Sequence, residues 1–385
     1  MPHDARVLDL DGLQTLIDVL DRRGYAVHGP TVRDGAIATG RIRTVADLPV
    51  GWGDEQERAH YRVRRRDDEA VFAFAAAAQS AKPVLFPADE LIWRSRHPDG
   101  EVPEIDTEWR DPDAAPVALL GVRSCDLAAI RMHDRILLQR LAADVRYAAR
   151  RAETFIVAVT CTDPGGTCFC ASTGTGPRPG EGYDLALTEL YADGPHRFVV
   201  SAGSPRGDEV LDEVVETSAA RPAGGEDLAA VDDAVHVAEG RMGRTLETEG
   251  LRYLLEAKVE SAHWDDVAAR CLTCTNCTLV CPTCFCTSVV DVTDLTGENS
   301  ERRRVWDSCF SKEYSYIHGG SVRESARSRY RQWISHKLGS WHDQFGSLGC
   351  VGCGRCITWC PAGIDITAEV AALRGDRPAS VPAAK

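Results

Sequence analysis

The sequence lacks the features of a membrane protein and of an exported protein. Its longest apolar run, VFAFAAAA at 71–78, is far shorter than the roughly 18 residues that indicate a membrane span. The first residues, MPHDARVLDLDG, carry acidic side chains where a signal peptide has a basic flank and then an apolar stretch. We therefore expect a cytoplasmic protein without a membrane span.

Positive charge and aromatic side chains are also scarce. Aromatic residues make up 7% of the chain, and 44 basic side chains face 58 acidic ones, for a formal net charge of −14. Phosphate backbones are bound by basic surfaces, so this balance argues against nucleic acid as the main partner.

No catalytic acid, base or nucleophile stands out. The 11 His residues are scattered without the i, i+4 pairing of a helical metal site. The best glycine-rich candidate, GTGPRPG at 174–180, has Pro179 where a dinucleotide-binding G-x-G-x-x-G needs its third glycine. We therefore expect no catalytic residues, and no flavin or NAD(P) bound by this chain.

Cysteine, in contrast, is abundant. The chain has 15 cysteines among 385 residues, an odd number, in a protein large enough to bury real cores without disulfides. In a reducing compartment, clustered cysteines are ligands or catalysts more often than disulfide partners.

Two segments repeat one cysteine pattern. CLTCTNCTLVCP begins at 271 and CVGCGRCITWCP begins at 350, and both read C-x2-C-x2-C-x3-C-P. In two-cluster ferredoxins, three of these thiolates bind one [4Fe–4S] cluster and the fourth binds the other cluster. The predicted ligands are Cys271, Cys274, Cys277 and Cys360 for the first cluster, and Cys350, Cys353, Cys356 and Cys281 for the second.

Structural zinc is the alternative, because C-x2-C pairs also bind zinc. Zinc takes its four ligands in pairs, however, and does not explain two quartets that each end in Cys-Pro. Pro282 and Pro361 suit the first turn of a helix, where the missing N–H costs nothing. Gly352 and Gly354 are expected to let the backbone approach the cluster sulfides. We therefore predict two iron–sulfur clusters.

The first 245 residues predict a mixed α/β domain. An amphipathic helix is expected at 10–23, and a strand, helix and strand at 117–122, 127–142 and 155–159 form a βαβ unit with parallel strands. Cys125 and Cys161 then follow the carboxyl ends of neighbouring strands, where open α/β sheets bind ligands.

These two cysteines suggest a third iron–sulfur centre. A Gly/Pro-rich loop at 163–182 adds Cys168 and Cys170, so the simplest ligand set is Cys125, Cys161, Cys168 and Cys170. The tetrapeptide TCFC occurs at 167–170 and again at 283–286, and a variant set mixes the two copies or includes Cys309. The alternative is that these are buried structural thiols. Cys284, Cys286 and Cys309 have no assigned role.

Helical patterning dominates the C-terminal part. After a predicted linker or peripheral loop at 221–234, residues 246–372 are expected to form an α-helical ferredoxin domain, with helices also between the quartets, as at 321–338. Residues 373–385 are expected to be a disordered tail.

Six motifs, taken in order, resemble one family. They are GVRSCD (121–126), TCFC (167–170), GYDL (182–185), CPTCFC (281–286), RRRVWDSC (302–309) and CVGCGRCITWCP (350–361). Their order resembles the β subunit of sulfhydrogenases, the cytoplasmic NAD(P)-linked [NiFe]-hydrogenases, over roughly 115–367. It is also similar to the electron-transfer subunit of anaerobic sulfite reductase. Residues 1–110 are covered weakly, and their role is open.

The resemblance implies an electron-transfer subunit. Its partners would be a flavin subunit that handles NAD(P)H and the small and large subunits of a hydrogenase. Two alternatives remain: the same role in a sulfite reductase, or a free-standing iron–sulfur redox sensor, against which stands the absence of a recognisable DNA-reading motif. Co-purifying subunits would distinguish the three.

Overall fold

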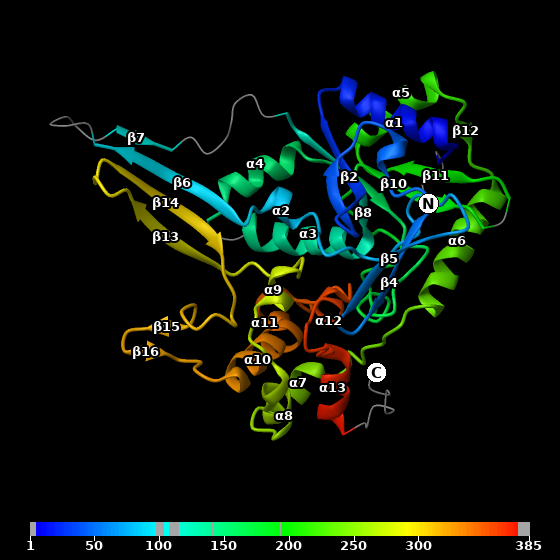
Figure 1. Ribbon diagram of the computed structural model, residues 1–385. Coiled ribbons are helices and arrows are strands. Elements are labelled where there is room, and N and C mark those ends of the chain that lie inside the picture. The colour runs from blue at the N-terminus through cyan, green and yellow to red at the C-terminus, as the bar shows by residue number, and fades with distance from the viewer. Residues whose placement is uncertain (1–4, 98–103, 108–114, 140–141, 193, 376–385) are drawn as a thin grey trace.

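A mixed sheet of eight strands forms the centre of the N-terminal half (Figure 1). The computed structural model describes residues 5–97, 104–107, 115–139, 142–192 and 194–375. In spatial order the strands are β12 (Arg221–Pro222), β1 (Arg6–Leu8), β11 (Arg197–Ala202), β10 (Leu185–Leu190), β9 (Phe155–Val159), β8 (Val117–Arg123), β2 (Ala26–Arg33) and β3 (Ala36–Arg41).

The four central strands β2, β8, β9 and β10 run parallel, and the outer strands are antiparallel to their neighbours. Between β8 and β9 the chain forms α3 (Ser124–Leu137) and α4 (Val145–Glu153). The predicted βαβ unit is therefore confirmed.

Helices cover both faces of this sheet. On one face α1 (Leu10–Arg22) and α5 (Pro205–Thr217) pack over the even positions of β8, such as Ala118 and Leu120. The odd position Leu119 faces the opposite side, against α2 (Lys82–Leu85), α3 and α4. This alternation is the period of two that places successive strand residues on opposite faces.

Residues 221–234, predicted to be a linker or peripheral loop, are instead β12 and the start of α6 (Gly225–Gly240). Val231, Val235 and Ala238 form a buried stripe at helical spacing, which the surrounding acidic residues obscure in the sequence. Asp227 accepts hydrogen bonds from the Arg221 side chain and from the Gly224 N–H, which fixes the first turn of the helix.

A second sheet projects from the body (Figure 1). Its strand order is β13 (Thr287–Thr293), β14 (Asn299–Trp306), β6 (Asp89–Arg96) and β7 (Glu104–Asp106). The prediction of helices throughout 282–349 is therefore wrong for residues 287–306, which are rich in β-branched side chains. Because β14 pairs with β6, this sheet also crosses the predicted domain boundary at 245.

Short helices form most of the C-terminal part. They are α7 (Leu251–Ala257), α8 (His263–Arg270), α9 (Asn276–Leu279), α10 (Ala326–Ser335), the π-helical turn η2 (His336–Ser340), α11 (Trp341–Phe345), α12 (Arg355–Thr358) and α13 (Ile366–Arg374). Because α13 reaches Arg374, the first two residues of the predicted tail are helical, whereas 376–385 lie outside the described residues.

The remaining elements are small. They are η1 (Val45–Asp47), the hairpin of β4 (Trp52–Glu57) and β5 (His60–Arg65), and the hairpin of β15 (Tyr316–Ile317) and β16 (Gly320–Ser321). Within the described ranges, no helix is long and apolar enough to cross a membrane.

One phenylalanine joins the two halves. Phe169, in the loop 167–170 of the N-terminal half, is 1% exposed and packs in the core formed by the C-terminal helices. Its N–H donates to the Gly352 carbonyl oxygen at 2.8 Å. Nearby, the buried Arg355 guanidinium forms an ion pair with Asp126 of α3.

We predict that Phe169→Ala lowers the free energy of unfolding by about 3–5 kcal/mol, because it leaves a cavity where the two halves meet. Denaturant unfolding of the iron-loaded protein would measure this. Tyr253→Ala is the control, because Tyr253 is 71% exposed and its loss should change stability little. Equal effects of the two variants would contradict the role of Phe169.

Candidate iron–sulfur centres

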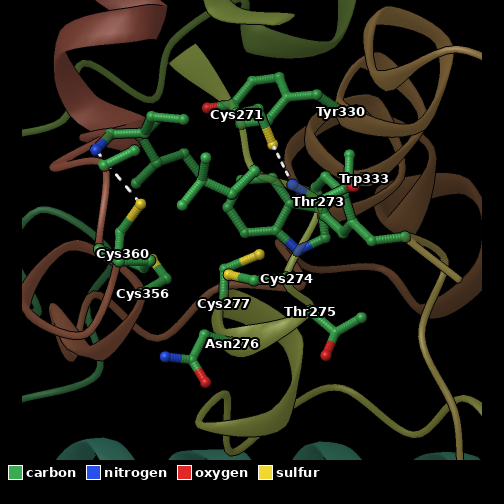
Figure 2. A pocket seen from close by; sticks show the side chains of 16 residues that line it. Cys271, Thr273, Cys274, Thr275, Asn276, Cys277, Tyr330, Trp333, Cys356 and Cys360 are labelled. Atoms are coloured by element: carbon green, nitrogen blue, oxygen red, sulfur yellow. Dashed lines mark hydrogen bonds between the residues drawn. The ribbon is translucent and has the colours of Figure 1, made fainter.

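The first site lies in the C-terminal half, where the four cysteines of the first predicted set line one cavity together with Cys356 of the second set (Figure 2). Three of these cysteines come from the loop around α9, and the fourth follows α12. The four residues are Cys271, Cys274, Cys277 and Cys360. The structure thus brings together the complete first ligand set, including the cysteine from the distant second motif.

Backbone N–H groups already point at two of these sulfurs. The Thr273 N–H lies 3.4 Å from the Cys271 sulfur, and the Ile364 N–H lies 3.4 Å from the Cys360 sulfur. Thr273 and Thr275 have positive φ values, 50° and 69°, which are uncommon for a β-branched residue. Strain of this kind is typical of loops shaped around a ligand.

The second site is more deeply enclosed. Cys281, Cys350 and Cys353 are buried. Burial, and then the neighbouring thiolates of Cys350, Cys353 and Cys281, raise the pKa of Cys356 well above its usual range. The structure therefore places the four cysteines of the second ligand set around one another.

The third predicted set also comes together. Cys125 lies in the first turn of α3, Cys161 follows β9, and Cys168 and Cys170 lie in the loop beyond. All four are buried and line one enclosed cavity, to which Cys353 of the second set also contributes. This is the convergence that parallel strands β8 and β9 predict.

The donor groups around the third cavity suit an anionic ligand. Arg123 lines the cavity, and its Nη2 donates to the carbonyl oxygens of Phe72 and Phe74. The Nε and Nη1 groups of Arg123 are buried without a hydrogen-bond partner. Burial raises the pKa of Cys168 to about 12, so a bound cation is needed to hold its thiolate at neutral pH.

The cysteines surround cavities and do not meet at a point. In the part of the chain that the structure describes, no three His, Cys, Asp or Glu side chains are arranged to bind a single metal ion. The first and third cavities are each lined by the four cysteines of one predicted set, the number of thiolates that binds a [4Fe–4S] cluster, and by one cysteine of the second set.

Gly352 and Gly354 also approach a second loop, which the sequence did not predict. A Cβ on Gly352 would lie 2.6 Å from the backbone N and Cα of Cys170, and a Cβ on Gly354 would lie 2.5 Å from the Thr167 carbonyl oxygen. The close approach that these glycines allow is therefore to the loop 167–170. It brings the second and third sites side by side.

The remaining cysteines lie away from the third cavity. The Cys309 side chain lowers the pKa of Cys286, and the Cys281 side chain raises the pKa of Cys284 well above its usual range. The two TCFC copies thus do not share a cavity.

Sequence reasoning missed the basic side chains at these sites. Arg123 and Arg355 stand inside the motifs GVRSCD and CVGCGRC, but their burial could not be seen in the pattern. Lys337 donates to the Cys281 sulfur at 3.3 Å. Its one available signal is rarity, because the chain has only five lysines.

A family comparison agrees with this geometry. Residues 270–364 match the model of the 4Fe-4S dicluster domain, so the chain is an iron–sulfur protein of the dicluster class. Over 273 residues the chain is 34% identical to sulfhydrogenase 2 subunit beta of Pyrococcus furiosus. The matched region covers 69% of this chain and 74% of that relative. The chain belongs to the sulfhydrogenase β-subunit family, as its motifs indicated, and is an iron–sulfur electron-transfer subunit.

We predict that Gly352→Ala disturbs the contact between the loops 350–354 and 167–170 and lowers both thermal stability and iron content. Gly346→Ala is a matched control, because Gly346 has a similar φ of +70° but nothing within 4 Å of the added Cβ. Backbone strain alone costs of order 1–3 kcal/mol, and both variants share it. If both variants keep equal iron and equal melting temperatures, the close approach does not matter.

Proposed function

We propose that this chain relays electrons between a flavin subunit that handles NAD(P)H and the small and large subunits of a [NiFe]-hydrogenase. It does so with three [4Fe–4S] clusters, at the three sites described above. When bound, such clusters supply reversible one-electron transfer. The chain holds the clusters, excludes water from them and sets the order in which electrons pass between them.

One observation carries this proposal: cysteines of the second ligand set also line the cavities of the first and third sets. Cys356, from the second ligand set, also lines the first cavity. Cys353, from the same set, lines the third cavity. The sites therefore form an unbroken row from the C-terminal helices to the edge of the central sheet, as a relay requires.

The third cluster is supported by the convergence of four cysteines from three places in the fold. A βαβ crossover brings Cys125 and Cys161 to one sheet edge, and Phe169 anchors the loop that carries Cys168 and Cys170. Structural thiols can be buried anywhere in a core and do not need to lie close together. Ligands of one cluster do, so a bound cluster explains why these four cysteines converge.

The partners are inferred from the family and from the absence of chemistry in the sequence. Neither a dinucleotide fingerprint nor a catalytic constellation stands out in this chain, so we assign nicotinamide and flavin chemistry to one partner and hydrogen chemistry to another. Clusters of this kind need reduced thiols, which favours the cytoplasm. The electron-transfer subunit of a sulfite reductase remains the competing identity.

We predict about twelve iron atoms per reconstituted chain. Cys170→Ala should lower this number to about eight, because Cys170 lines the third cavity. Cys284→Ala should leave it at about twelve, because Cys284 does not line that cavity. Iron and acid-labile sulfide analysis would measure this. Cys284→Ala controls for loss of a neighbouring thiol. About eight iron atoms in the unmodified chain would eliminate the third cluster and leave the other two.

A tagged chain isolated from its native host tests the relay itself. We expect nickel and flavin to co-purify in constant ratio to the chain, measured by elemental analysis and by flavin fluorescence after denaturation. Sirohaem absorbance in place of nickel would identify a sulfite reductase. Isolation as a stable monomer with neither group would contradict the proposed role within a complex.

A further inference from the structure

Lys337 is a buried cation at the second site. Its side chain lies in the π-helical turn η2 and is 3% exposed. The ammonium donates to the Cys281 sulfur at 3.3 Å, to the Thr283 hydroxyl at 3.0 Å and to the Gly349 carbonyl oxygen at 2.9 Å. π-Helical turns are rare and are found frequently at functional sites.

The three acceptors are themselves connected. The Thr283 hydroxyl lies 3.2 Å from the Cys281 sulfur and donates to the Gly349 carbonyl oxygen at 2.7 Å. The Gly349 N–H in turn donates to the Lys337 carbonyl oxygen at 2.7 Å. Gly349 directly precedes Cys350, so the network touches two cysteines of the second ligand set, and the ammonium has little freedom to move.

Lys337 has no carboxylate partner. Among the ion pairs of the described residues, none includes Lys337, although a buried charge is costly unless it is paired. The buried arginine nearby, Arg355, is paired with Asp126. The negative charge that can pair with the Lys337 ammonium is therefore the Cys281 thiolate and the cluster proposed to be bound to it.

At the first site the nearby cation does not hydrogen-bond to sulfur. The charge of Arg329 opposes the rise that burial causes in the pKa of Cys271. Across the described ranges, the hydrogen bonds to the Cys271 and Cys360 sulfurs come from backbone N–H groups and not from a Lys or Arg side chain. Its cavity is walled by Phe310, Tyr330 and Trp333. The two sites therefore bind the same cluster type in different electrostatic surroundings.

We propose that Lys337 is the counter-charge of the second cluster and raises its reduction potential above that of the first. This inference rests on the proposed ligand set of the second cluster. A nearby positive charge stabilises the more negative, reduced state, and hydrogen bonds to cluster sulfurs act in the same direction. An electron that enters at the first site then settles at the second. Lys337 acts through Cys281 and is a positioning residue.

The test is an anaerobic redox titration of the full, iron-loaded chain, followed by the EPR signal of the reduced clusters. In Lys337→Met the ratio of reduced to oxidised second cluster should fall about tenfold at a fixed potential. This fall corresponds to a reduction potential about 59 mV lower for a one-electron couple. The potential of the first cluster should not change. Lys337→Arg keeps the charge and should restore most of the shift.

Two further variants separate charge from packing. Lys337→Gln keeps an N–H donor but not the charge, and should lower the potential as the Met variant does, even if the Met variant loses iron. Lys312→Met removes an exposed lysine and should change nothing. Unchanged potentials in an iron-loaded Gln variant, or equal shifts in the Arg and Gln variants, would overturn the inference. Fewer than about eight iron atoms in the unmodified chain would instead refute the cluster assignment.

Discussion

The contact between the loops 167–170 and 350–354 is the constraint on which the arrangement of the sites depends. Because Gly352 and Gly354 lack a Cβ, the backbones of the two loops come closer than other residues would allow. The Phe169 N–H donates a hydrogen bond to the Gly352 carbonyl oxygen. One loop carries two cysteines of the third set, and the other carries two of the second. A single interface between two backbones therefore fixes the separation of two of the proposed cluster sites, without any long side chain that could change its rotamer.

Charge compensation is the second organising constraint. Buried thiolates are costly, and the structure surrounds them with basic groups held by short, specific contacts. Arg355 is clamped by Asp126, Arg123 by two carbonyl oxygens, and Lys337 by Thr283 and Gly349. In a chain with a net charge of −14, these three cations lie where sulfur is buried.

Cysteine spacing and strand periodicity predicted much of this. The quartets identified both main ligand sets because ligand spacing is dictated by the size of a cluster and not by the fold. The parallel strands 117–122 and 155–159 brought Cys125 and Cys161 together because a crossover leaves the carboxyl ends at one edge. Residues 287–306 were misread although β13 and β14 pair with each other as a local hairpin rich in β-branched residues. What no local pattern records is the further pairing of β14 with β6, some 200 positions earlier. Burial of Lys337 was likewise invisible, because it depends on contacts with Thr283 and Gly349.

The exposure of Cys274 has a consequence for the lifetime of the protein in air. Cys274 is exposed, whereas the third set is buried throughout and the second is mostly so. Oxygen and chelators therefore reach the first cysteine set before the other two. With the proposed clusters bound, damage would begin at this set, and a partly degraded sample would lack the first cluster before the others.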